Sequence, residues 1–151
     1  MTSKQKNKKI KIILVANSSW YLYNFRLQLL NDLVKDGFEV ILIAPKDNFT
    51  NFLKEFGFSF YNWNLKGLSI NPFIELKSFL ELLNLYKNLR PDLVHHFTIK
   101  SCIYGTLSAK FAGVKIVVNA ITGLGYVFLS KTRKALILRT LLKPLYRLIF
   151  K

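Results

Sequence analysis

Cysteine, histidine and long apolar runs are all scarce in this sequence. Its one cysteine, Cys102, excludes an intramolecular disulfide framework and fits a reducing compartment. The two histidines, His95 and His96, are adjacent, and no second cluster of His, Cys or carboxylate residues has the spacing of metal ligands, so we expect no metal site. No apolar stretch approaches the roughly 18 residues that a membrane-spanning helix needs.

Glycine-rich phosphate-binding motifs are also missing. Neither a G-x-G-x-x-G pattern after the first apolar run nor a P-loop is present, although such motifs are what lets a backbone approach a pyrophosphate closely. We therefore do not expect a stand-alone NAD or ATP site, and we expect no cofactor.

Acidic residues are missing from both ends of the chain. All eight lie between Asp32 and Asp92, so residues 1–31 and 93–151 carry six and ten basic residues without an acid, and the net charge is +15. This distribution fits nucleic acid, an anionic membrane or a phosphorylated ligand. It also fits a protein whose missing acids lie on a part absent from this chain. Composition alone does not choose among the four.

The first 16 residues resemble a signal peptide, because a basic run precedes an apolar one. The apolar run, 10–16, is short and interrupted by Lys11, and no small-residue cleavage site follows it. We interpret 1–9 as a flexible basic tail and 10–16 as the first strand of a domain that covers 10–151.

Short β-branched runs alternate with segments of helical period along the whole chain. The predicted strands are 10–16, 39–44, 58–63, 93–97 and 115–120, and the predicted helices are 22–33, 48–56, 72–90, 101–112 and 131–151. This order predicts an α/β fold: a Rossmann-like parallel sheet of about five strands with helices on both faces. In the third helix, one apolar stripe is formed by Phe73, Leu76, Leu80, Leu83 and Tyr86.

Polar residues follow the first predicted strand, at the edge where ligands bind in open α/β sheets. Asn17, Ser18 and Ser19, followed by Trp20, could donate hydrogen bonds to a sugar or phosphate ahead of a helix. The alternative is that they only cap that helix. Both interpretations remain open from the sequence.

The histidines end the fourth predicted strand. Adjacent strand residues point to opposite faces, so at most one of His95 and His96 faces a cleft, where it would suit general-base catalysis. The other would be a packed histidine with a structural hydrogen bond.

Two further strand ends could hold an anion. Thr122, Gly123 and Gly125 follow the fifth strand, where glycines expose backbone N–H groups. Lys100 and Lys46 follow neighbouring strands and add positive charge, although a surface lysine needs no function.

The last predicted helix is basic and amphipathic. Its basic stripe repeats every four residues and consists of Arg139, Lys143, Arg147 and Lys151. Such a helix is typical of a membrane surface or a partner interface, and equally of an ordinary outer helix packed on the sheet.

Three segments resemble the N-terminal domain of family-4 glycosyltransferases, especially the bacterial branch that adds N-acetylhexosamines to undecaprenyl-diphosphate-linked saccharides. They are KIILVANSSWYLYNFR at 11–26, PDLVHHFTIK at 91–100 and NAITGLG at 119–125. The resemblance implies a metal-free, retaining GT-B enzyme of cell-surface glycan biosynthesis, in which the N-terminal half holds the acceptor and the C-terminal half binds the nucleotide-sugar.

By that resemblance, one of His95 and His96 has the catalytic role. Asn17, Ser18, Ser19, Trp20, Arg26, Lys100, Thr122, Gly123 and Gly125 would line the site for the acceptor and the phosphates. Many relatives have a histidine where Thr122 stands, and the glutamate pair of the donor domain has no counterpart, since no carboxylate follows Asp92.

The leading hypothesis is therefore the truncated acceptor-side domain of a glycosyltransferase, inactive alone, with a nucleotide-sugar donor and a lipid-linked or polysaccharide acceptor. It would be cytoplasmic and peripheral at the inner face of the membrane, with a possible partner chain carrying the donor domain. The alternative is a non-catalytic basic module that docks on an anionic membrane or a partner subunit. Nucleic acid ranks last, because no binding motif accompanies the charge.

Overall fold

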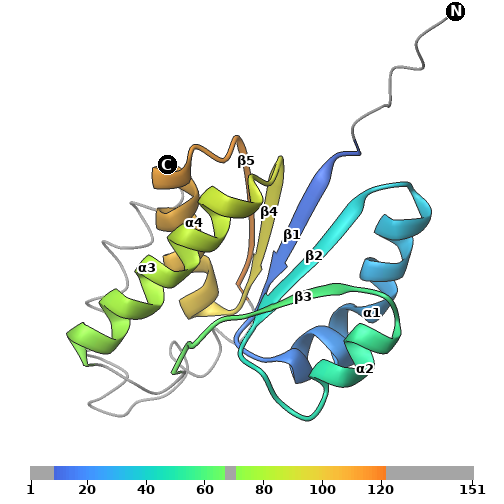
Figure 1. Ribbon diagram of the computed structural model, residues 1–151, viewed down its shortest axis with the longest axis horizontal. Coiled ribbons are helices and arrows are strands. Elements are labelled where there is room, and N and C mark those ends of the chain that lie inside the picture. Colours follow the sequence, from blue (N-terminus) through green and yellow to red (C-terminus); the bar gives the residue numbers. More distant parts are fainter. Residues whose placement is uncertain (1–8, 67–70, 122–151) are drawn as a thin grey trace, which may run out of the picture.

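The computed structural model describes residues 9–66 and 71–121 of the chain. They form five strands and four helices in strict alternation (Figure 1). The strands are β1 (Lys11–Val15), β2 (Glu39–Ala44), β3 (Ser59–Asn62), β4 (Leu93–Phe97) and β5 (Ile116–Ala120). The helices are α1 (Ser19–Lys35), α2 (Thr50–Glu55), α3 (Pro72–Leu89) and α4 (Ile99–Ala112).

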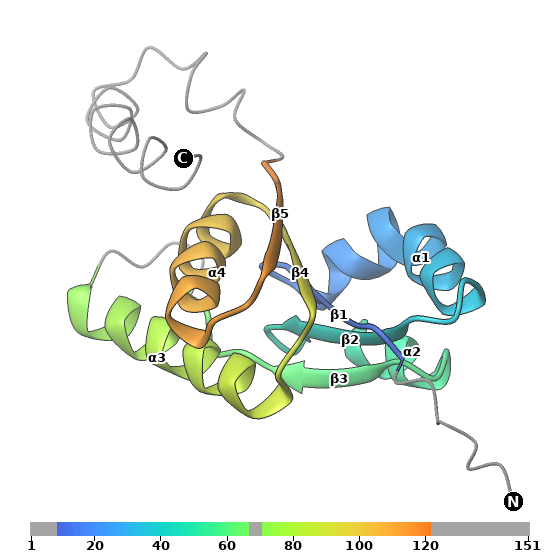
Figure 2. The ribbon, with the colours of Figure 1, turned by 90° about the horizontal axis from the view of Figure 1, so that it is seen from above.

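All strand pairs are parallel, and the sheet order is β3-β2-β1-β4-β5. Helices α1 and α2 cover one face of the sheet, and α3 and α4 cover the other (Figure 2). The central strand shows why, since Ile12 and Leu14 belong to one apolar core while Ile13 and Val15 belong to the second. A strand buried on both faces needs a continuous apolar run, as β1 and β2 have.

The predicted fold class is confirmed, and each predicted element within the described residues lies within a few residues of its observed position. Helices α1 and α4 begin two or three residues earlier than expected, because their N-caps, Ser18 and Thr98, lie within three residues of the ends of β1 and β4. Residues 1–8 of the predicted tail (1–9) and the predicted helix at 131–151 lie outside the described residues. None of the described helices has both the length and the apolar character that crossing a bilayer requires.

The apolar stripe of α3 does not form one buried face, although such a stripe normally points to the core. Only Tyr86 among its members is fully buried, while Phe73, Leu76 and Leu80 are 82%, 55% and 46% exposed. The buried positions are instead Ser78, Leu82 and Tyr86. Ser78 is accommodated because its hydroxyl donates a hydrogen bond to the Asn64 carbonyl at 3.0 Å and its own carbonyl accepts one from the Trp63 indole at 2.8 Å.

Candidate functional site

The loop after β1 lies at the carboxyl edge of the sheet and mostly serves the fold. Ser18 is the N-cap of α1, and its hydroxyl accepts a hydrogen bond from the Tyr21 N–H at 3.1 Å. Ser19 is fully buried; its hydroxyl donates to the Pro45 carbonyl at 3.0 Å and lies 2.7 Å from the Thr50 hydroxyl. Ser18 therefore caps α1, and Ser19 holds α1 against the loop after β2.

Asn17 and Trp20 are the exposed members of that loop. The backbone N–H of Trp20 donates to the Asp47 carboxylate at 2.8 Å, and its ring meets the edge of Phe25 at 5.3 Å. Asp47 also accepts from the Phe49 N–H at 2.8 Å, so one side chain fixes two loops. Asp47 was not among the predicted site residues, although its position three residues after the end of β2 was a usable signal.

Arg26 lies over the end of β4. Its guanidinium stands 4.6 Å from the centre of the Phe97 ring and 5.3 Å from that of Tyr21, and it donates to the Tyr21 hydroxyl at 2.7 Å. Its Nε is buried without a hydrogen-bond partner within the described part of the chain. A half-buried cation at this edge can attract an anionic group.

His95 shares this half-buried position with Arg26. Its ring lies 4.1 Å from the Phe97 ring on the side of the sheet that α1 covers. Burial, and then the Arg26 charge, lower the pKa of His95 to about 4. The imidazole is therefore neutral near pH 7, which is the form that can accept a proton.

His96 points to the opposite face and is fully buried. Its Nδ1 lies 2.8 Å from the Asn119 amide oxygen, which can only accept, so Nδ1 carries the proton and Nε2 accepts from the Tyr86 hydroxyl at 2.9 Å. The Asn119 amide nitrogen donates to the Thr106 hydroxyl at 2.9 Å. This network joins α3, β4, β5 and α4, and neither ring nitrogen of His96 is left for a ligand.

Both histidines make stability depend on pH. Burial lowers the pKa of His96 as well, to about 4, whereas an unfolded histidine titrates near 6.5. Between about pH 6.5 and 4 the unfolded chain binds more protons, so stability falls as the pH falls through this window. The fully buried His96 contributes at most about 1.4 kcal/mol per pH unit, and the half-buried His95 contributes less because solvent screens its charge. Urea unfolding at several pH values measures this, and His96→Asn should flatten the dependence. Constant stability from pH 7 to 5 would contradict the assignment.

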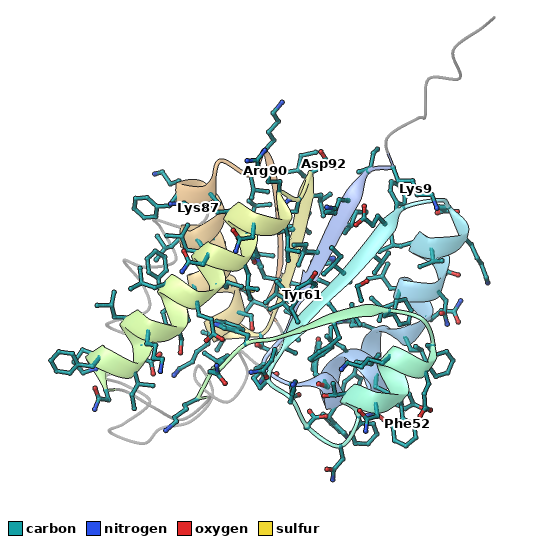
Figure 3. The ribbon with its side chains drawn as sticks, in the orientation of Figure 1. Lys9, Phe52, Tyr61, Lys87, Arg90 and Asp92 are labelled. Atoms are coloured by element: carbon teal, nitrogen blue, oxygen red, sulfur yellow. The ribbon has the colours of Figure 1, made fainter. Side chains whose placement is uncertain are left out.

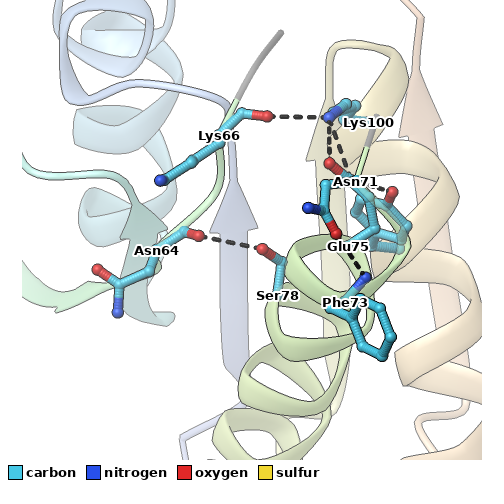
Figure 4. Close-up of polar contacts among 8 residues, drawn as sticks. Asn64, Lys66, Asn71, Phe73, Glu75, Ser78 and Lys100 are labelled. Atoms are coloured by element: carbon cyan, nitrogen blue, oxygen red, sulfur yellow. Dashed lines mark hydrogen bonds and ion pairs between the residues drawn. The ribbon is translucent and has the colours of Figure 1, made fainter. Parts of the chain in front are cut away.

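Lys100 is engaged within the protein. Its ammonium donates to the Glu75 carboxylate at 2.9 Å and to the Lys66 carbonyl at 2.9 Å (Figure 4). The Tyr104 hydroxyl also donates to Glu75, and burial together with that carboxylate raises the pKa of Tyr104. Lys100 thus joins the start of α4 to the start of α3, a role that the sequence analysis did not anticipate.

The remaining strand ends complete the edge. Thr122, Gly123 and Gly125 lie outside the described residues, but β5 leads toward them from beside β4, where the Thr98 N–H donates to the Ala120 carbonyl at 3.3 Å. Thr98 has a φ of 72°, which costs a β-branched residue free energy. A hollow of about 360 Å³ lies at the ends of β2 and β3, and its lining includes Lys46, Asn62 and Lys66.

Among residues 9–66 and 71–121, no three His, Cys, Asp or Glu side chains lie together as metal ligands would. What this edge offers instead is Arg26, Lys46, amide side chains and one half-buried neutral histidine. The fold and this edge define a Rossmann-like domain of the kind that forms one half of GT-B enzymes.

Comparison with known proteins gives the family. Residues 11–151 match the family model described as glycosyl transferase 4-like, and the chain belongs to that family. It is also 30% identical over 142 residues to the N,N'-diacetylbacillosaminyl-diphospho-undecaprenol alpha-1,3-N-acetylgalactosaminyltransferase of Campylobacter jejuni. That match covers 94% of this chain but only 38% of the relative.

Solved structures support the fold. MurG of Acinetobacter baumannii matches with a TM-score of 0.60 at 20% identity, over 76% of this chain and 36% of MurG. A glycosyltransferase of Rickettsia africae matches with a TM-score of 0.60 at 15% identity, over 83% of this chain and 34% of that one. A UDP-N-acetylglucosamine 2-epimerase matches with a TM-score of 0.57 at 19% identity, over 72% of this chain and 31% of the epimerase, so the fold alone does not select the reaction.

Proposed function

We propose that this chain is the acceptor-side half of a glycosyltransferase that moves a sugar from a nucleotide-sugar to a lipid-linked saccharide. The main support is the 30% identity over almost the whole chain to a transferase whose acceptor is a diphospho-undecaprenol saccharide. The acceptor would lie along the carboxyl edge of the sheet. We place the enzyme in the cytoplasm, peripheral to the inner face of the membrane, because such an acceptor is anchored in lipid.

The edge suits that acceptor chemically. Arg26 and Lys46 supply positive charge for a diphosphate, while Asn17 and the exposed ring of Trp20 could contact sugar hydroxyls and ring faces. His95 is the histidine with the better access, being half-buried and neutral near pH 7. In this proposal, no cofactor or metal takes part, and the donor is a substrate.

Transfer also needs a donor-binding half, because the chain spans 38% of the curated relative. We therefore expect the purified 151-residue protein to show no transfer from nucleotide-sugars to a short-chain, water-soluble prenyl-diphosphate saccharide. Adding a polypeptide that supplies the donor half, such as one encoded by the neighbouring reading frame, should restore it. Transfer by the 151 residues alone would contradict the proposal that a separate donor-binding half is required.

Acceptor binding by the chain itself is the second test. Isothermal titration with the same soluble acceptor should show binding that Lys46→Gln weakens about tenfold, as expected for one lost charge-assisted hydrogen bond. Lys87→Gln is the matched control, since Lys87 is an exposed lysine near the amino edge of the sheet. No binding, or equal weakening by both variants, would favour the alternative of a non-catalytic basic module.

A further inference from the structure

Another hollow lies between the second half of α1 and the end of α2. Its volume is about 280 Å³, close to the lower end of the range for small-ligand sites. Asn31 in its lining lies roughly 18 Å along the axis of α1 from Ser19, so this hollow is separate from the candidate site after β1. We call it the α1–α2 hollow, and its lining includes Gln28, Asn31, Val34, Lys35, Phe56 and Phe58.

Part of this lining is an aromatic ring that is accessible and yet held in place. Phe56 is 53% exposed, and Val34 in the same lining is 50% exposed. The centre of the Phe56 ring lies 6.3 Å from that of Tyr23, and the Tyr23 ring in turn contacts Phe49 at 5.3 Å and Phe52 at 5.7 Å. Phe56 therefore presents a supported ring on which an apolar ring face can pack.

The lining also offers uncharged hydrogen-bonding groups. The amide nitrogen of Gln28 donates to both carboxylate oxygens of Asp32, at 3.0 and 3.1 Å, so the amide is oriented and its oxygen can accept a hydrogen bond from a ligand. Asn31, three residues further along α1, is half-buried and supplies both a donor and an acceptor. Such amides match hydroxyl groups, which also both donate and accept.

The surroundings of the hollow carry no net charge, although the whole chain has a net charge of +15. The one cation of the lining, Lys35, lies 3.7 Å from the Asp32 carboxylate. Helices α1 and α2, each taken with the residue that ends it, carry three basic and three acidic residues: Arg26, Lys35, Lys54, Asp32, Asp36 and Glu55.

The other side of the sheet differs in this respect. Helices α3 and α4, counted in the same way, carry five basic residues against two acidic ones. Figure 3 shows Phe52 on the outer side of α2, well away from Lys87 and Arg90 on the side of α3. A phosphate or a nucleotide-sugar, which needs positive charge, is therefore better served elsewhere on this molecule than at the α1–α2 hollow.

We propose that the α1–α2 hollow binds one pyranose ring of a neutral saccharide. The C–H face of the ring packs on Phe56 and Val34, and its hydroxyl groups bond to Gln28 and Asn31. A pyranose combines an apolar ring face with hydroxyls that need partners, which is the combination that this lining offers. The inference rests on the proposed function for its biological purpose, since a glycan held here would keep a glycosyltransferase close to its saccharide substrate.

Titration of the full chain with N,N′-diacetylchitobiose, a neutral disaccharide, followed by two-dimensional proton–nitrogen NMR, tests the site. The side-chain amide signals of Gln28 and Asn31 should shift together, while the indole signal of the fully buried Trp63 should stay in place. Phe56→Ala should weaken binding about tenfold, because it removes the ring on which the sugar packs. Phe52→Ala is the matched control, since Phe52 is 47% exposed on the same helix but lies outside the lining, and it should bind like the wild type.

A second pair of variants tests the polar contacts. Asn31→Ala should also weaken binding about tenfold, whereas Asn51→Ala, at an exposed amide of α2 outside the lining, should not. Circular dichroism establishes that each variant is folded.

Unshifted Gln28 and Asn31 amides, or equal weakening by a variant and its control, would refute the site. So would inorganic phosphate that shifts these amides as strongly as the disaccharide does, because the hollow would then recognise charge. If Phe56→Ala abolished self-association while the disaccharide had no effect, the surface would be a protein interface instead.

The outcome is separable from that of the proposed function. A chain that binds the disaccharide at the α1–α2 hollow but gives no transfer when a donor half is supplied would keep this inference and refute the other. Transfer by the completed enzyme without any disaccharide binding at the hollow would do the reverse.

Discussion

Among alanine substitutions at the described glycines, Gly105→Ala is expected to destabilise the protein most. A Cβ at Gly105 would lie 2.3 Å from the Cδ2 atom and 2.4 Å from the Nε2 atom of His96. The ring cannot yield freely, because Tyr86 and Asn119 hold its two nitrogens. We expect a loss of about 3 kcal/mol in the free energy of unfolding, at the upper end for overpacking, measured by urea denaturation.

The clash with His96 can be isolated by a double-mutant cycle. His96→Ala alone should also destabilise the protein, since it leaves a cavity and removes the hydrogen-bond partner of the buried Tyr86 hydroxyl. In the Gly105→Ala background, however, it removes the atoms that the new methyl group meets. The double variant should therefore be more stable than the sum of the single effects predicts. Strict additivity would show that Gly105 is needed for another reason.

Trp63→Ala should destabilise the protein to a similar extent, and the other tryptophan, Trp20, provides a matched control. Trp63 is fully buried and its indole N–H donates to the Ser78 carbonyl at 2.8 Å, whereas Trp20 is 46% exposed. Truncating a buried tryptophan costs about 4 kcal/mol, and an exposed one under about 1 kcal/mol. Urea denaturation of Trp63→Ala and Trp20→Ala measures the difference.

The fluorescence of the two variants supplies an independent reading, because each retains a single tryptophan. In Trp20→Ala the remaining indole should be shielded from a soluble quencher until the protein unfolds. In Trp63→Ala the remaining indole should be quenched in the folded state. An equal loss in the free energy of unfolding in the two variants, or equal quenching of their folded states, would contradict the packing described for the core under α3.

The strands and helices of the sheet could be predicted because each is indicated by its own residues and those next to it. Continuous apolar runs such as that of β2 report burial on both faces, and the glycines after α1 and α4 report where each helix ends, with Gly113 at a φ of 75°. The parallel direction of the strands follows from general rules for alternating α/β chains, whereas the strand order and the pairing of β1 with β4 come from the structure. The strands and helices therefore depend on neighbours in sequence, whereas the order of the sheet joins distant segments, such as Ile12 with Leu93.

The candidate site was predictable only in position. The sequence placed His95 and His96 on opposite faces but could not say which was buried, because that depends on Tyr86 and Asn119, which are distant in the chain. Ser19 has the appearance of a ligand-binding serine, yet it bonds the loop after β2. Likewise, the apolar stripe of α3 is visible in the sequence, but only the structure shows that Phe73, Leu76 and Leu80 are exposed.

The strand order has a consequence for how the chain is made. β1 sits at the centre, pairing with β2 on one side, where Ile12 meets Val40, and with β4 on the other, where Ile12 meets Leu93. During synthesis the first partner emerges early, but the second edge of β1 stays open until β4 has left the ribosome. The apolar residues Ile13 and Val15 also lack their full cover until α3, which precedes β4, and α4, which follows it, have both emerged. The nascent chain therefore passes through a stage at which its central strand is half paired, and that stage is when it most needs protection from aggregation.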